Sequence, residues 1–183
     1  MTDAPPPETG IEPPRRRTTM LLLVVGAVAL LLDILTKVLV VATLSDQPPL
    51  RLLGGAVYFT LARNSGAAFS LGTGMTIVFT LLALIVVLVI VRTARKLYSR
   101  GWAISLGLVL GGALGNLVDR MFRHPGPFRG AVIDFISVFD PWGRTWPIFN
   151  LADSAIVVGG VLAVILAFAG VEMDGTRNRK ADR

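Results

Sequence analysis

The sequence predicts an all-α polytopic membrane protein with four transmembrane helices and a small extracytoplasmic β-like segment. The chain has 183 residues, of which 53% are hydrophobic and 16% are charged, and its mean hydropathy is +0.67. Soluble domains carry roughly a quarter charged residues, so this balance is typical of a protein within a bilayer. Four long apolar runs, separated by stretches rich in proline, glycine and charge, predict the four spans.

Residues 1–19 form a proline-rich tail with an arginine run at residues 15–17, and we expect this tail to be disordered. The apolar run at residues 20–44 has the arginine-rich start of a secretory signal peptide. However, it is roughly twice as long as the apolar core of such a peptide and contains Asp33 and Lys37. No convincing cleavage pattern follows it. We therefore interpret it as a retained first transmembrane helix.

The segment at residues 45–74 contains two adjacent prolines, two adjacent glycines and a β-rich stretch at residues 57–61. We expect it to lie outside the hydrocarbon. A second apolar run at residues 75–91 is long enough for a short transmembrane helix. A third span is expected at residues 102–118. Its glycines recur at every fourth position, which predicts a face for close helix packing: Gly107, Gly111 and Gly115.

Residues 121–149 form a second stretch that does not span the membrane, and it contains two tryptophans suited to a membrane interface. The fourth span is expected at residues 150–171. Basic residues dominate the end of the chain. The predicted organisation is therefore a cytoplasmic tail at residues 1–19, a four-helix membrane domain at residues 20–171 and a basic cytoplasmic tail at residues 172–183.

The distribution of basic residues predicts the orientation. Eleven of the 18 lysines and arginines lie in the two tails and in the short segment between the second and third spans. By the positive-inside rule, both termini are expected in the cytoplasm, with residues 45–74 and 121–149 outside. The net charge of +6 has the same origin, so it does not indicate a nucleic-acid partner.

Two residue types restrict the chemistry. The chain has no cysteine and a single histidine, His124. A thiolate nucleophile, cysteine-ligated zinc and an HExxH metalloprotease site are therefore excluded. A Ser-His site would depend on this one loop histidine.

Four carboxylates are expected to converge near the outer boundary of the membrane. Asp119 lies about 26 Å along its helix from Trp102, at a rise of about 1.5 Å per residue. Ionisable groups at membrane depth are costly, so each is a candidate for function. Two carboxyls that converge can share one proton, an arrangement that activates water for peptide hydrolysis. The four are Asp33, Asp119, Asp134 and Asp153.

Residue types alone leave two other interpretations open. One is a buried ion-pair network of these acids with Lys37, Arg63 and Arg120. In it, Asp33 pairs with Lys37 one helical turn away, and Asp119 packs with Arg120 or its neighbours. The other is a small proton-coupled exporter, which needs its acid near the midplane to be reached from both sides. Acids at one edge of the membrane favour a one-sided hydrolytic site over an exporter.

The chain resembles the lipoprotein signal peptidases, also called signal peptidase II, in five blocks that occur in the family's order and with similar spacing. The blocks are DILTK at residues 33–37, NSGAAFS at 64–70, GGALGNLVDR at 111–120, VIDF at 132–135 and FNLADSA at 149–155. A basic, proline-containing stretch at residues 122–129 departs mildly from the family's pattern and lengthens the segment before Asp134.

The resemblance implies an intramembrane aspartyl endopeptidase of the bacterial inner membrane. Such an enzyme removes the signal peptide from prolipoproteins by cutting before the diacylglyceryl-modified cysteine. The matching blocks imply Asp134 and Asp153 as the catalytic pair. The implied partners are prolipoproteins, membrane lipid and the inhibitor globomycin, and neither a metal nor a cofactor is implied. Supporting or substrate-binding roles are implied for Asp33, Lys37, Asn64, Gly66, Asn116, Asp119, Arg120, Asn150 and Ala152.

Overall fold

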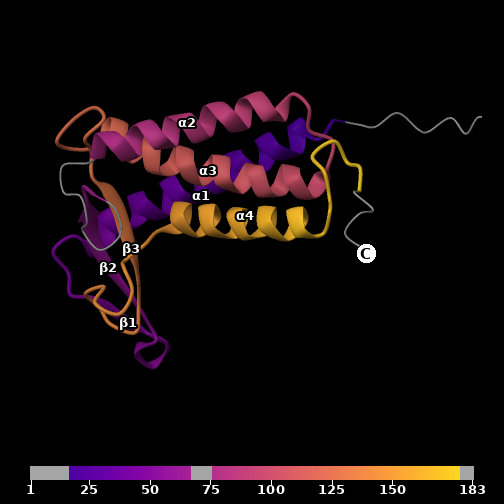
Figure 1. The fold of residues 1–183 in the computed structure, drawn as a ribbon. Helices are drawn as coiled ribbons and strands as arrows, with labels where there is room; N and C mark the ends of the chain where they lie inside the picture. Colours follow the sequence, from indigo (N-terminus) through magenta and orange to yellow (C-terminus); the bar gives the residue numbers. More distant parts are fainter. Residues whose placement is uncertain (1–16, 67–75, 178–183) are drawn as a thin grey trace, which may run out of the picture.

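The computed structural model describes residues 17–66 and 76–177, and within them the chain forms four long helices and a small sheet (Figure 1). Each of these helices is long and apolar enough to cross a membrane. The predicted fold class is therefore confirmed. The helices are α1 (Thr19–Leu44), α2 (Thr76–Ala94), α3 (Arg100–Phe122) and α4 (Leu151–Phe168).

Some expectations fall on other parts of the chain. Most of the expected N-terminal tail, the last four residues of the NSGAAFS block and the end of the C-terminal tail lie outside the described residues.

The observed helices differ from the predicted spans mainly at their ends. α3 begins earlier because the Ser99 hydroxyl caps its first turn, accepting a hydrogen bond from Trp102 N at 3.4 Å. It also ends later than predicted, since it continues through its polar last turn to Phe122. α4 ends at Phe168, and Gly170 follows in the left-handed region with a φ of 67°. Glycine adopts this conformation readily, and it commonly ends helices.

α3 lies at the centre of the bundle and packs against the other three helices. A Cβ atom at Gly111 would lie 2.5 Å from the carbonyl oxygen of Gly26 on α1, and one at Gly107 would lie 2.8 Å from that of Leu22. These two glycines form the close helix contact that their spacing predicts. On another side of α3, Gly112 lies against Ala152 of α4. Small residues on α3 therefore allow close packing against both α1 and α4.

The sheet has three antiparallel strands in the order β1-β2-β3. They are β1 (Leu50–Leu52), β2 (Val57–Asn64) and β3 (Val132–Val138), and a short 3-10 turn, Leu53–Gly55, follows β1. The β-rich stretch at residues 57–61 is confirmed as part of β2. β3 lies within the stretch at residues 121–149, where the sequence predicts no strand. Its residues are buried on both faces, so it lacks the alternation of apolar and polar residues that identifies a strand in sequence.

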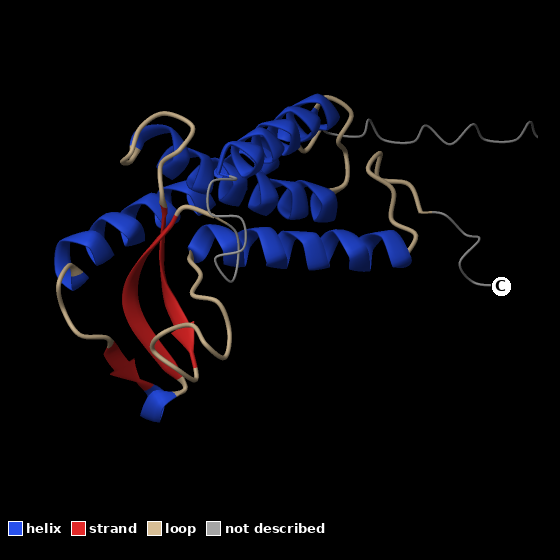
Figure 2. Ribbon diagram, turned by 60° about the vertical axis from the view of Figure 1, so that its left-hand side comes forward, coloured by secondary structure: helices blue, strands red, loops and turns tan. Residues whose placement is uncertain are grey.

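The sheet lies at the end of the bundle where α1 ends and α4 begins, which we call the sheet end (Figure 1). Its strands run across the helix axes (Figure 2). Val40 of α1 packs with Ile133 and Phe135 of β3 in one buried cluster. This cluster fixes the height at which β3 crosses the bundle, and it therefore sets the position of Asp134.

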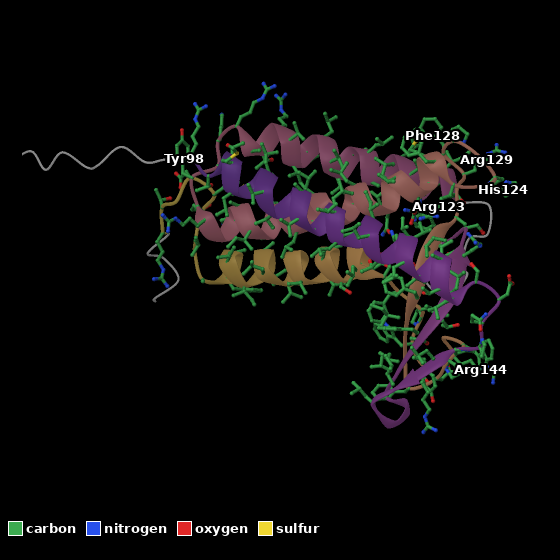
Figure 3. The ribbon with its side chains drawn as sticks, turned by 180° about the vertical axis from the view of Figure 1, so that it is seen from behind. Tyr98, Arg123, His124, Phe128, Arg129 and Arg144 are labelled. Atoms are coloured by element: carbon green, nitrogen blue, oxygen red, sulfur yellow. The ribbon has the colours of Figure 1, made fainter. Side chains whose placement is uncertain are left out.

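At the opposite end of the bundle the chain turns back after α4. The backbone N–H groups of Tyr98 and Ser99 donate to Met173 O at 2.9 Å and 3.1 Å. The indole N–H of Trp102 donates to Val171 O at 2.7 Å. Residues 171–177 are thus folded against the start of α3, beside Tyr98 (Figure 3).

Candidate active site

Asp134 lies in the middle of β3, and its carboxylate is held by two amide side chains. Asn64, the last residue of β2, donates to Oδ2 at 2.9 Å, and Asn150 donates to Oδ1 at 2.7 Å. Asp134 is 3% exposed. The strand pairing brings Asn64 here, because Ala62 lies opposite Asp134 in the register of β2 and β3. The block containing Asn64 and the block containing Asp134 therefore meet through the sheet.

Asp153 lies in the first turn of α4, where it closes a reciprocal helix cap with Asn150. The Asp153 N–H donates to Asn150 Oδ1 at 2.9 Å, and the Asn150 N–H donates to Asp153 Oδ2 at 3.1 Å. Asn116 of α3 donates to the other oxygen, Oδ1, at 2.7 Å. Helix capping thus orients Asp153. Asn150 also binds Asp134, so it links the two carboxylates.

Both carboxylates line one cavity of about 700 Å³ at the sheet end of the bundle. Burial, and then the charge of nearby Asp153, raise the pKa of Asp134 to about 7. Asn64, Asn116 and Arg120 add polar groups to the walls. The remaining lining residues are mostly apolar: Gly66, Val132, Trp146, Pro147, Ile148, Phe149, Ser154, Val157 and Val158.

Behind the cavity, Lys37 is buried at the centre of a charged network. Its Nζ atom lies 2.7 Å from Asp33 Oδ2 and 2.8 Å from Asp119 Oδ2, and it donates to Asn116 Oδ1 at 3.1 Å. The predicted pairing of Asp33 with Lys37 is confirmed. Asp119 is expected to pack with Arg120 or its neighbours, and the structure shows that its partners are Lys37 and the neighbouring Arg123. Arg123 directly follows α3, one helical turn after Asp119, and its side chain reaches back to that carboxylate, whereas Arg120 lines the cavity.

This network also positions the backbone around the site. Asp33 Oδ1 accepts a hydrogen bond from Ala152 N at 3.0 Å, which ties α1 to the start of α4. Asp119 Oδ2 accepts one from Ile133 N at 3.2 Å, which ties α3 to β3 immediately before Asp134. Each element that carries a cavity carboxylate is therefore bound to one acid of the Lys37 network: α4 to Asp33 and β3 to Asp119.

The family model for signal peptidase (SPase) II matches residues 25–169. The chain belongs to the signal peptidase II family. Family membership makes it a peptidase and argues against the exporter interpretation. The matched range contains all five sequence blocks.

Curated relatives and solved structures agree with the family assignment. The chain is 56% identical over 149 residues to the lipoprotein signal peptidase of Streptomyces griseus, covering 81% of this chain and 74% of that one. It is 52% identical over 155 residues to that of Mycobacterium tuberculosis, covering 85% and 74%. A bacterial membrane enzyme solved at 2.3 Å is 27% identical with a TM-score of 0.67, covering 82% of this chain and 87% of that one.

The remaining positions of the matched blocks lie around the same cavity. Arg120 lines it and donates to Asn116 O at 3.3 Å. Gly66 also lines it, and its N–H donates to Asn64 Oδ1 at 2.9 Å, which orients the Asn64 amide toward Asp134. Ala152 is buried against α3. All the matched positions named in the sequence analysis therefore lie at the cavity or directly behind it.

A second cavity of about 320 Å³ adjoins the first, and both are lined by Asn64, Gly66, Asp134, Pro147 and Ile148. Arg63 and Trp142 belong to the lining of the smaller cavity, whereas Trp146 belongs to that of the larger one. Sequence reasoning missed this role of the segment between β3 and α4. It assigned the two tryptophans only to the membrane interface, and no pattern in the segment predicts which cavity each would line.

Proposed function

We propose that the chain is an aspartyl endopeptidase that removes the signal peptide from diacylglyceryl-modified prolipoproteins, cutting before the lipid-modified cysteine. The observation that carries this proposal is the presence of Asp134 and Asp153 in one cavity at the end of four membrane-spanning helices. The membrane domain at residues 20–171 holds every residue that we assign to the site. The names of the curated relatives support the class of substrate.

The raised pKa of Asp134 supports one division of roles. In the proposed mechanism Asp134 carries the shared proton and Asp153 acts as the base. Asp153 takes a proton from a water molecule, which attacks the carbonyl carbon of the scissile peptide bond. Asp134 donates a hydrogen bond to the carbonyl oxygen as negative charge develops there. The intermediate then collapses, the C–N bond breaks and the leaving amine takes the proton that Asp153 accepted from water. Asn64 and Asn150 hold the Asp134 carboxyl in place throughout.

The two cavities suggest how the substrate lies. Val157 and Val158 of α4 line the larger cavity, so this cavity extends along a membrane-spanning helix. An apolar signal peptide and the lipid chains can lie there. The smaller cavity is lined by the sheet and the segment after it, and it suits the chain that follows the cysteine. The scissile bond would then lie at Asp134, which both cavities share.

Purified protein in detergent tests this function. We expect it to cleave a diacylglyceryl-modified prolipoprotein without any ion gradient, to leave the unmodified precursor intact and to be inhibited by globomycin. EDTA is expected to have no effect, because the proposed chemistry uses two carboxyls and water. Activity lost with chelator and restored by zinc would contradict the two-aspartate mechanism.

The pH dependence tests the assignment of the proton. Asp134 must be protonated, and its pKa is about 7, so turnover should fall as pH rises through about 7. The loss should follow a single deprotonation. The measurement is kcat/KM against pH with a lipidated substrate, because this ratio reports the pKa values of the free enzyme. A kcat/KM that instead rises through this range would mean that Asp134 acts as the ionised base.

We also propose that the sheet end of the bundle faces outward and that both termini are cytoplasmic. The exposed basic residues between α2 and α3 support this orientation. The cysteine-free chain allows a direct test with Lys96→Cys and Asp46→Cys, both at exposed positions. In intact cells, an impermeant maleimide should label Asp46→Cys and should not label Lys96→Cys. Labelling of Lys96→Cys from outside would reverse the orientation.

A further inference from the structure

Two large apolar side chains project from the far end of the sheet. Leu53, in the turn after β1, is 80% exposed, and Phe139, which follows β3, is 69% exposed. Nothing lies within 4 Å of a Cβ atom built at the neighbouring Gly54, so this position of the turn faces open space. We call Leu53 and Phe139 the apolar tip.

Both residues of the apolar tip adopt a backbone conformation that large side chains disfavour. The φ angle is 47° at Leu53 and 65° at Phe139, in the left-handed region. In the turn between β1 and β2, Leu53 is followed by Gly54 and Gly55, which both have positive φ. Asn, Asp and Gly are the residues that such turns favour. A small or polar residue at either position would therefore make the folded turn more stable.

Hydrogen bonds hold the two exposed residues in one unit. The Phe139 N–H donates to Ala56 O at 3.0 Å, which joins the turn after β3 to the turn before β2. The Arg51 guanidinium donates to Gly54 O at 2.6 Å, and the Ser137 hydroxyl donates to Asp140 O at 2.5 Å. The apolar tip is therefore presented by two fixed turns.

The orientation of the sheet indicates what covers the apolar tip. The strands run across the helix axes, so the sheet extends sideways from the bundle at the level where the helices end (Figures 1 and 2). The far end of the sheet also leans toward the side on which the helices lie (Figure 3). With the four helices in a bilayer, this level is the boundary between acyl chains and headgroups. The exposed Arg51 lies two residues from Leu53 and suits lipid phosphate.

We propose that the apolar tip inserts into the lipid leaflet at the sheet end of the bundle and holds the sheet at a fixed depth. A lipid surface accounts for the exposed apolar side chains and for their retention in an unfavourable conformation. Because β2 and β3 run from this tip to Asn64 and Asp134, a fixed depth for the sheet sets the height of the cavity. The inference depends on membrane insertion and not on the proposed catalytic chemistry.

Fluorescence quenching tests the contact with lipid. Leu53→Cys carries an environment-sensitive dye, and the protein is placed in vesicles of phosphatidylglycerol and phosphatidylcholine brominated near the headgroup end of the acyl chains. Arg144→Cys is the matched control, since Arg144 is exposed and lies on the side of the sheet away from the helices (Figure 3). A residue buried about 5–10 Å below the headgroups should be quenched by bromine roughly threefold more than the control. Equal quenching at the two positions, or efficient quenching of the Leu53 probe by aqueous iodide, would refute the inference.

A second variant separates lipid contact from a structural role. Leu53→Gly relieves the unfavourable φ, so its melting temperature in detergent should equal or exceed that of the parent. In vesicles, the same substitution should reduce bromine quenching of a dye at Phe139→Cys, because the dye replaces Phe139 and the substitution then removes the remaining apolar side chain of the tip. A lower melting temperature in detergent would show that Leu53 is needed for folding, and the anchor would then be abandoned. Both measurements are independent of peptidase activity.

Discussion

Asp134→Asn and Asp153→Asn are each expected to abolish cleavage, lowering turnover by about a thousandfold or more. Each substitution removes one half of the proposed proton-sharing pair and leaves a side chain of nearly the same shape. The double variant should be little worse than either single variant, because the two groups act as a unit. The measurement is the rate of cleavage of a lipidated precursor beside the melting temperature of each variant.

The same variants carry a prediction for stability. The pKa of Asp134 is raised in the folded protein, so folding favours the protonated form and stability declines as pH rises from about 4 to about 7. Asp134→Asn removes this titration but leaves one of the two amide donors, Asn64 or Asn150, facing an N–H2 group. Its melting temperature should therefore vary less with pH between about 4 and 7 than that of the parent. Asp46→Asn, at an exposed position, is the control for the loss of one charge. Near-normal turnover of Asp134→Asn, together with a folded but inactive Asp119→Asn, would move the catalytic role to Asp119.

Lys37→Met should cause the largest loss of stability in the chain. It leaves Asp33 without its cation and Asp119 with Arg123 alone, and removing one partner of a buried pair costs about 3–5 kcal/mol. It also removes the donor to Asn116, which orients Asp153. We expect a strongly lowered melting temperature and poor recovery of folded protein. Lys96→Met, at an exposed position, should change neither.

The partners of Lys37 also predict a graded series. Asp33→Asn alone should be milder than Lys37→Met, because Lys37 keeps Asp119 and Asn116. Adding Asp33→Asn to Lys37→Met removes the unpaired carboxylate and should recover much of the lost stability, since Asp119 still has Arg123. If the double variant were less stable than Lys37→Met, the cost would lie in packing and not in an uncompensated charge.

The sequence predicts the spans well because a membrane helix needs a long apolar run, and four such runs are visible in it. It does not predict β3 as a strand, because burial of both faces removes the alternation of residues, so it places Asp134 only in a stretch outside the membrane spans. The choice of Arg123 over Arg120 as the partner of Asp119 depends on which way each side chain points at the end of α3. Both arginines lie within four residues of Asp119, so the sequence alone does not distinguish between them. The walls of the cavity come from a segment without regular structure, whose path is set by tertiary contacts such as the bridge between Ile136 and Phe149.

The cap at the start of α4 links the activity of the chain to the order of its synthesis. Asn150 and Asp153 close the first turn of the last membrane helix, and Asn150 also holds Asp134. A growing chain that has inserted only three helices therefore has one carboxylate without its partner and without one of its two amide donors. On the proposed two-aspartate mechanism, competence for hydrolysis is then expected only when the fourth helix inserts and caps itself. We therefore expect a chain that has inserted three helices to be inactive in cleavage.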